Sequence, residues 1–513
     1  MLYFPCKNTV SSPLNVSWDT NCVILGDLVC RHMSTLARNV GKVYHLLLRG
    51  RVSDLAKNTM DMTKGTIWKQ LLIFAVPLFF GNLFQQMYNT VDSLIVGNYV
   101  GSEALGAVTS VGSAINTFIG FFSGFATGAG VVVSHAFGAK NYEEVSDSVH
   151  TILLSTVIIS AVLSVLGVSL SPQVIRFMNT PPEIAPMAIE YLRVYFMGIL
   201  GLMLYNICSG ILRAVGDSIK PLKILIFSSF LNIILDLIFV VKFNMGVRGV
   251  AVATIISQFT SDILLLAILY RSRECYQFRF GKLRNASLRI LGKVMKIGFP
   301  AGLQMSIISL SNVFVISYIN AFGALCTSGF GIYCRINGVL NLPFEVMSMA
   351  ITTFTGQNAG AGKPERIKKA FRFAILYVMV MSAMELSIIF LFGSNMARLF
   401  NQNPEVVRYA DLFLKVIVLL HFICSINASM AGVMRGIGRA YIPMYMMLFC
   451  YVVMRQAYLF VMSRIWNTPV MVGFSFSFGW ICCFVMMGLY FRHSHWEDEV
   501  RKNAIGKIEE REE

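Results

Sequence analysis

The chain has 513 residues, of which 56% are hydrophobic and 14% charged, and its mean hydropathy is +0.64. This composition excludes an ordinary soluble globular domain and indicates an integral membrane protein. The net charge of +16 at pH 7 would suit nucleic-acid binding. However, the basic residues cluster in stretches between apolar runs, so we expect a lipid bilayer as partner and no nucleic acid.

Residues 1–60 differ from the rest of the chain. They are mixed in composition, weakly periodic and contain no clean apolar core of a signal peptide. Met60 and Met62 each stand directly before the first long apolar run, where a natural start would lie. We therefore interpret 1–60 as a disordered extension or as the product of a misplaced upstream start.

Twelve apolar runs follow, and each is long enough to cross a hydrocarbon core of roughly 30 Å as a helix of about 20 residues. They lack strict alternation with a period of two, which favours helices over a barrel. The expected spans are 68–97, 104–136, 147–170, 187–214, 218–242, 248–270, 292–320, 326–357, 367–393, 408–435, 441–464 and 470–491. The sequence predicts an all-α integral membrane protein with twelve transmembrane helices.

One passage of the chain occurs twice, at an offset of 222 positions. Arg176-Phe-Met-Asn returns as Arg398-Leu-Phe-Asn. Gly210-Ile-Leu-Arg-Ala-Val-Gly returns as Gly432-Val-Met-Arg-Gly-Ile-Gly. Repeated helical bundles in a membrane are the usual build of secondary transporters. We predict two pseudo-symmetric lobes of six helices each, with the substrate cleft between them.

The basic residues orient the predicted helices. Lys and Arg are abundant in 271–296 and 363–372, whereas the loops 97–103 and 320–329 contain none. The positive-inside rule therefore places both termini in the cytoplasm, and we expect a multi-pass protein of a bacterial cell membrane. The expected organisation is a first lobe at 61–270, a basic cytoplasmic linker at 271–291, a second lobe at 292–492 and a solvated cytoplasmic tail at 493–513.

Carboxylates inside apolar spans are costly and usually functional. Asp92 follows Tyr88 by four positions and Asp236 follows Asn232 by four, so each pair shares a helix face. With Thr254, both acids lie roughly 8–9 Å inside the outer boundary, so they can converge. Two close carboxylates must share a proton or hold a cation between them. The sequence therefore predicts a site for H⁺ or Na⁺ coupling formed by Tyr88, Asp92, Asn232, Asp236 and Thr254, with Na⁺ between the two acids. The alternative is that both acids only hydrogen-bond neighbouring helices.

Other polar residues of the first lobe are secondary candidates. Gln258 and Asp262 continue the stripe of Thr254 on the sixth span, although Asp262 lies about 20 Å deep. Pro77 removes one backbone hydrogen bond from the first span, which predicts a kink that serves either as a hinge or as a static bend.

The second lobe has no counterparts of the two paired acids, because the repeat places Val315 and Tyr458 at their positions. Its own acids include Glu345, a further candidate whose structural alternative is an ion pair with Arg455. No Walker, GxSxG or HExxH motif occurs, so the sequence does not indicate an enzyme. Transport would then be driven by an ion gradient, with H⁺ or Na⁺ as coupling ion and no other cofactor.

Three passages resemble the multidrug and toxic compound extrusion (MATE) family. The run 77–97, which begins Pro77-Leu-Phe-Phe-Gly, resembles the first helix of these transporters. Thr355-Gly-Gln-Asn-Ala-Gly-Ala-Gly-Lys resembles their signature after the eighth helix. Asn232-Ile-Ile-Leu-Asp, followed by 246–254, resembles the fifth and sixth helices of the DinF-like branch.

The resemblance implies a V-shaped, twelve-helix antiporter that exports cationic, amphiphilic organic molecules and xenobiotics, and we expect it to be a monomer. It implies a cation site at Asp92, Asn232, Asp236 and Thr254, with Tyr88 nearby. It also implies that the first helix bends at its proline. The alternative function is a lipid or lipid-linked oligosaccharide flippase of a related superfamily, which would have a strongly cationic central cleft.

Overall fold

The computed structural model describes residues 59–178, 180–271 and 278–502. The described residues belong to one compact unit. The prediction of a disordered or misplaced extension at 1–60 therefore lies outside the described residues, except for its last two positions. Throughout the part that the structure describes, the regular elements are helices and no strand occurs.

Seven α-helices form the first lobe. They are α3 (Ile67–Ile95), α4 (Ser102–Gly138), α5 (Tyr142–Phe177), α6 (Ala185–Met197), α7 (Ile199–Ala214), α8 (Ile219–Asp236) and α9 (Gly246–Arg271). Short π-helical segments, Val96–Val100 and Leu237–Lys242, extend α3 and α8. Asp92 and Asp236 therefore both lie in the last α-helical turn before a π segment, a feature that is frequent at functional sites.

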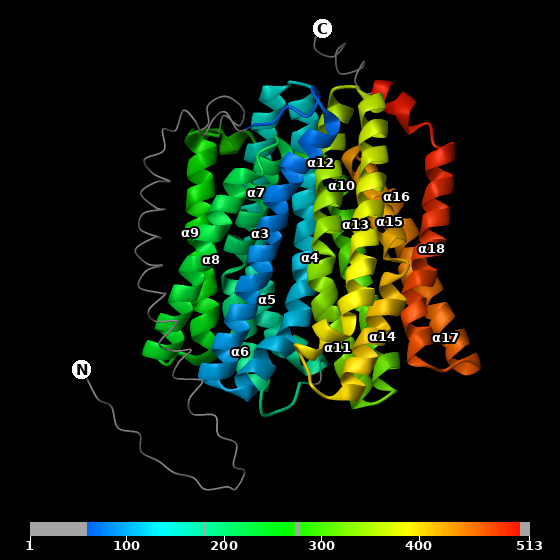
Figure 1. The fold of residues 1–513 in the computed structure, drawn as a ribbon. Helices are drawn as coiled ribbons and strands as arrows, with labels where there is room; N and C mark the ends of the chain where they lie inside the picture. The colour runs from blue at the N-terminus through cyan, green and yellow to red at the C-terminus, as the bar shows by residue number, and fades with distance from the viewer. Residues whose placement is uncertain (1–58, 179, 272–277, 503–513) are drawn as a thin grey trace, which may run out of the picture. The chain divides into compact units, whose positions relative to one another are not determined.

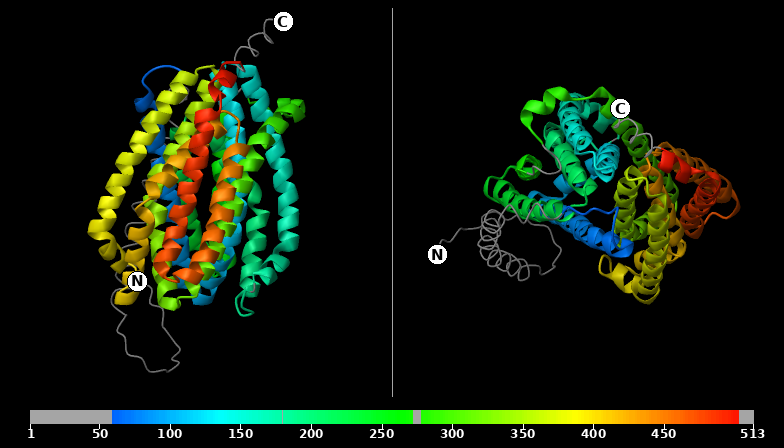
Figure 2. Two further views of the ribbon diagram at one scale, coloured as in Figure 1. Left: turned by 90° about the vertical axis from the view of Figure 1, so that its right-hand side faces the viewer. Right: turned by 90° about the horizontal axis from the view of Figure 1, so that it is seen from above.

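The second lobe follows a 3-10 helix at Phe280–Asn285. Its helices are α10 (Leu288–Asn320), α11 (Ala324–Leu340), α12 (Leu342–Gly360), α13 (Pro364–Arg398), α14 (Pro404–Val418), α15 (His421–Gly436), α16 (Tyr441–Leu448), α17 (Arg455–Ile465) and α18 (Pro469–His493). A π segment at Phe449–Met454 joins α16 to α17. Figures 1 and 2 show the helices of both lobes running side by side along a common direction.

The internal repeat is visible in how two spans are bent. Nine helical segments of the described residues are long and apolar enough to cross a membrane, and two bent pairs bring the number to eleven. The pairs are α6 with α7, bent by 48°, and α14 with α15, bent by 50°. The bends fall at Gly198 and at Leu419–Leu420, which the repeat offset of 222 positions relates. The two halves of the chain therefore repeat their backbone as well as their sequence.

The eighth span is not the single helix that the sequence predicted for 326–357. It is divided at Asn341 into α11 and α12. Pro343 stands among the first residues of α12, where its fixed φ and missing N–H suit a helix start. The signature passage that was expected after this span instead forms the last turns of α12, up to Gly360. With this divided span, the fold is the twelve-helix, two-lobe arrangement that was predicted.

One helix keeps its predicted proline in its interior, and one end of the chain differs from expectation. Pro77 lies inside α3, which continues on both sides of it, and the kink at this residue stays a prediction. Residues 493–502 are not a freely solvated tail, because Trp496 and Val500 are buried against α13 and α15. The ion pair of Glu497 with Lys368, at 2.5 Å, holds the same segment to α13.

The two lobes meet backbone to backbone along α4 and α10. A Cβ added at Gly124 would overlap the backbone of Gly302, and one added at Gly128 would lie 2.6 Å from the Gly298 nitrogen. Glycines four positions apart on both helices permit this close approach. Farther along α10 the side chain of Phe314 is 57% exposed. The close contact therefore involves the first half of α10 and not the second.

Candidate functional site

Asp92 of α3 and Asp236 of α8 face each other. Their carboxyl groups lie within hydrogen-bonding reach of one another, and Asp236 has no exposed surface. Among the described residues, no N–H or O–H donates to either oxygen of Asp236 or to Oδ1 of Asp92. Two facing carboxylates without a donor repel each other unless a proton or a cation joins them. The pair is therefore chemically suited to take up H⁺ or Na⁺.

A polar cavity of about 20 Å³ lies one helical turn from this pair. Tyr88, Asn232, Thr254 and Gln258 all contribute to its lining. Neither the oxygen nor the nitrogen of the Asn232 amide has a hydrogen-bond partner among the residues that the structure describes. The volume is enough for about one water molecule. Four of the residues singled out from the sequence thus converge on a space that could hold a single small polar species.

Sequence reasoning missed several groups around this cavity. Tyr191 of α6 lies close enough to both Asp92 and Asp236 to interact with them electrostatically. The missed residues that line the cavity are Leu202, Leu225, Gln85, Tyr205, Ser228, Ser229, Ser257 and Ser261, and Tyr191 is not one of them. The serines stand three, four or seven positions from Asn232 or Thr254, so a search for polar stripes on apolar helices could have found them. No such pattern points to Tyr191.

Asp262 is placed differently from the paired acids. It lies one turn beyond Gln258 on α9, against α7, where it interacts electrostatically with Tyr205 and Cys208. The residue is 2% exposed, and neither of its carboxylate oxygens has a hydrogen-bond partner among the described residues. It therefore belongs to the interior of the first lobe.

A larger cavity of about 310 Å³ lies between the lobes, with lining residues from both of them. Glu345 of α12 is one of these. The alternative ion pair of Glu345 with Arg455 is wrong, because the Arg455 guanidinium donates to the Ser311 hydroxyl at 2.7 Å and lies over the Phe476 ring. Glu345 instead presents its charge to the space between the lobes, where the substrate cleft was predicted.

A further buried contact of the second lobe involves Glu385 and His421. The Nδ1 atom of the His421 ring lies 3.0 Å from Oε2 of Glu385, and both side chains are buried. This geometry agrees with a hydrogen-bonded pair in the core of the lobe, which was the structural interpretation of His421. The pair lines neither of the two cavities described above.

The lobes are also joined where α3 begins and α7 and α12 end, which we call the sealed end. Gln357 of α12 donates to the Ala214 carbonyl at 2.9 Å and accepts from the Met62 N–H at 2.8 Å. The guanidinium of Arg366 donates to the Met62 carbonyl at 3.0 Å. The short segment before α3 is therefore fastened to the second lobe, with Met62 fully buried.

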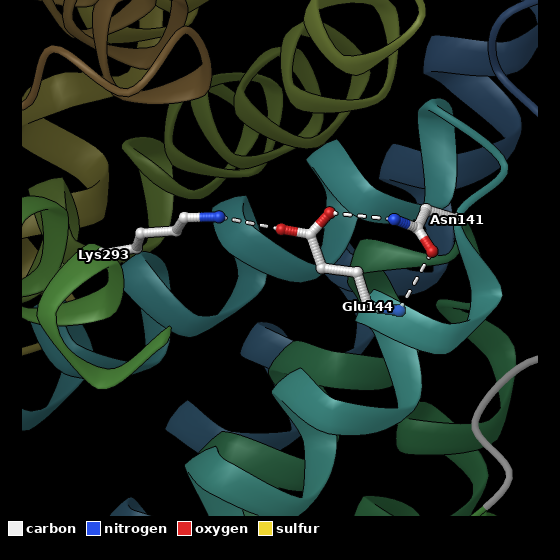
Figure 3. A network of polar contacts seen from close by, with 3 residues as sticks. All are labelled: Asn141, Glu144 and Lys293. Carbon is white, nitrogen blue, oxygen red and sulfur yellow. Dashed lines mark hydrogen bonds and ion pairs between the residues drawn. The ribbon is translucent and has the colours of Figure 1, made fainter. Parts of the chain in front are cut away.

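The sealed end also contains an ion pair between the lobes and a hydrogen-bonded turn at Asp61. Figure 3 shows Lys293 of α10 paired with Glu144 of α5 at 2.9 Å, while Asn141 accepts from the Glu144 N–H at 3.1 Å and caps α5. Burial acts to raise the pKa of Asp61, but hydrogen bonds from the Thr63 hydroxyl and N–H outweigh it and hold the pKa below its ordinary value. Asp61 therefore keeps this turn ordered as a carboxylate.

Replacing Gln357 by Leu is expected to loosen the sealed end. The substitution leaves the Met62 N–H and the Ala214 carbonyl without their partner, at a cost of about 1–3 kcal/mol for each buried group. Spin labels at the exposed residues Glu143 and Lys369, in a background without native cysteines, would measure the distance between the lobes. We expect a broader and longer distance distribution in the variant. An unchanged distribution would show that this amide does not hold the lobes together.

Two lobes of six spans, a cavity between them and a facing pair of acids within the first lobe define a membrane transporter of the two-lobe type. The MatE family profile matches residues 77–238 and 300–460. The chain therefore belongs to the MatE family, the multidrug and toxic compound extrusion transporters.

Individual relatives agree with this family. The probable multidrug resistance protein YpnP of Bacillus subtilis is 29% identical over 440 residues, which cover 85% of this chain and 97% of YpnP. The probable multidrug resistance protein NorM of Thermotoga maritima is 29% identical over 389 residues, covering 74% and 82%. A solved multidrug resistance MATE transporter in an outward-facing conformation superposes with a TM-score of 0.81 at 22% identity, covering 87% of this chain and 99% of that one.

Proposed function

We propose that this protein is an antiporter that exports small organic cations and other xenobiotics across a bacterial cytoplasmic membrane in exchange for H⁺ or Na⁺. The observation that carries the proposal is the facing pair of Asp92 and the fully buried Asp236, which lacks hydrogen-bond donors among the described residues. The multidrug resistance names of the relatives support the same substrate class.

The proposed coupling ion binds the first lobe, apart from the cavity that takes the substrate. A proton or a Na⁺ at the acid pair removes the repulsion between the two carboxylates. Asn232, one turn before Asp236 on α8, and Thr254 of α9 both line the small cavity next to the pair. An ion drives a transport cycle only if it binds the two conformations with different affinity. In this proposal the ion favours the arrangement in which α3 and α8 pack closely, and the substrate favours the other.

The charges of the sealed end indicate which side of the membrane it faces. Basic residues gather there on the described parts of the linker and on the first turns of α10 and α13, among them Lys282, Lys293 and Lys369. By the positive-inside rule we infer that this end faces the cytoplasm. The structure then corresponds to a state with the cytoplasmic side closed.

Ethidium efflux from energised membrane vesicles tests the proposal. We expect efflux that stops when the coupling gradient is collapsed, with the pH gradient and the Na⁺ gradient removed in separate experiments. Loss of efflux with one of them identifies the ion. Efflux that survives the loss of both gradients would contradict ion coupling, and no gradient-dependent efflux of any organic cation would contradict the export of this class.

The flippase alternative has one observation in its favour. The cavity of about 310 Å³ between the lobes, called the central cavity below, is lined by two arginines, Arg213 and Arg435. Glu345 lines it as well, so its charge is mixed and not strongly cationic. Reconstituted vesicles with a fluorescent lipid would distinguish the two functions, because only a flippase would move the lipid between leaflets.

A further inference from the structure

The two arginines of the central cavity occupy equivalent positions of the internal repeat. Arg213 is the last residue but one of α7, and Arg435 is the last residue but one of α15. Each stands within a passage of the form Gly-x-x-Arg-x-x-Gly. Both side chains line the cavity of about 310 Å³ between the lobes. The repeat therefore brings two guanidinium groups to one space from opposite lobes.

Neither guanidinium is neutralised by a carboxylate of the part of the chain that the structure describes. No carboxylate lies within ion-pair distance of either group among the described residues. The one hydrogen bond that either makes to a side chain in that part of the chain is from Arg435 to the Ser348 hydroxyl, at a long 3.4 Å. In contrast, the more exposed Arg408 pairs with Glu405 at 2.7 Å.

An unpaired charge at membrane depth is costly, and residues that carry one usually serve a substrate. The guanidinium fork matches a carboxylate or a phosphate and donates two parallel hydrogen bonds to it. A basic residue in the last turn of a helix can also serve only to offset the helix dipole. That structural role does not require the side chain to line a cavity, as both of these do.

The same cavity holds one group of the opposite sign. Glu345 lies in the first turn of α12, where the helix dipole favours a negative charge, and its side chain is exposed to the cavity. Ser348, which receives the hydrogen bond from Arg435, follows one turn later at about 4.5 Å of helix rise. Glu345 and the arginines are therefore staggered along the cavity, with the arginines nearer the sealed end.

We propose that the central cavity binds a zwitterionic substrate, an organic cation that also carries a carboxylate. The carboxylate lies between Arg213 and Arg435, and the cationic centre lies beside Glu345. This inference rests on the proposed export function, for which it specifies the substrate class. The cavity volume of about 310 Å³ is within the range of small-molecule sites.

A matched pair of dyes tests this assignment: a rhodamine with a free carboxylate and its methyl ester, which keeps the cation and loses the anion. Their dissociation constants are measured by fluorescence anisotropy with the full chain in lipid nanodiscs, after subtraction of binding to empty nanodiscs. We expect the carboxylate form to bind at least about tenfold tighter than the ester, because two charge-assisted hydrogen bonds are lost with esterification.

The variants separate recognition from general charge. The double substitution R213Q/R435Q should remove the preference for the carboxylate, whereas R213K/R435K should retain part of it, since lysine keeps the charge and loses the fork. The control is R176Q/R398Q, which removes the same charge from a second pair of repeat-related arginines that are exposed and do not line the cavity. It should leave the preference unchanged.

Three outcomes would overturn the inference: equal binding of both dyes by the unaltered protein, a preference that survives R213Q/R435Q, or an equal loss in the control. If glycerophosphocholine competes through the arginines and the carboxylated dye does not, the site takes a lipid headgroup and the assignment to a soluble zwitterion is wrong. Binding is measured without transport. A failure of dye export in vesicles would therefore count against the proposed function alone.

Discussion

Efflux driven by an ion gradient is expected to fall to the level of empty membranes when Asp236 is replaced by Asn. The amide preserves the shape of the carboxyl group, but it does not gain or lose a proton and no longer offers a charge to Na⁺. An ion that binds both conformations equally shifts no equilibrium between them. Asp92→Asn should act in the same direction, because the two acids form one site.

Two measurements keep this result apart from simple misfolding. Exchange of labelled substrate without any gradient should persist in Asp236→Asn, because substrate binding and the movement of the lobes remain. The thermal stability of the purified variant should be unchanged or higher, since one member of a repelling pair becomes neutral. Glu103→Gln, an exposed acid at the start of α4, is the control. Normal gradient-driven efflux in both aspartate variants would refute the coupling site.

The second large effect is expected from Gly124→Val at the contact of α4 with α10. A Cβ at this position would overlap the Gly302 backbone, so neither a rotamer change nor a small side-chain shift can relieve the clash. The lobes must separate along these helices, and the state with the sealed end closed is lost. Spin labels at Glu143 and Lys369 should report a longer distance, and gradient-driven efflux should be abolished.

Gly112→Val on the same helix is the matched control, because a Cβ there would meet no atom within 4 Å. The control should retain both the distance distribution and the efflux of the unaltered protein. If Gly124→Val behaved like the control, the close contact of α4 with α10 would not be a feature of the working transporter.

Much of the fold could be predicted, because the lengths of the apolar runs and the internal repeat can be read directly along the chain. The bends at Gly198 and Leu419–Leu420 were not predicted, since neither site carries the proline that would announce a break. The division of the eighth span at Asn341 could have been found, because Leu-Pro directly after an asparagine is a helix start signal. The packing of residues 496–502 could not, since a charged segment with one Trp and one Val has little periodicity.

For the candidate site, the sequence predicted the depth of the side chains but not the direction in which they point. Depth arithmetic from the helix rise was enough to suggest that Asp92 and Asp236 meet, because it compares positions along parallel helices. It says nothing about which way a side chain faces around a helix. For this reason Tyr191 was missed. Arg213 and Arg435 were identified as equivalent positions of the repeat, but the sequence did not indicate that they line one cavity.

The fastening of Met62 between the lobes has a practical consequence for anyone who labels this protein. Bulk added directly before Met60 would press on the hydrogen bonds of Met62 to Gln357 and Arg366, so a reporter placed at that point would disturb the movement it was meant to follow. Trp496 and Val500 make the C-terminal side similarly sensitive. The exposed turn at Gly323, where a Cβ would meet nothing within 4 Å, is the better place for an insertion.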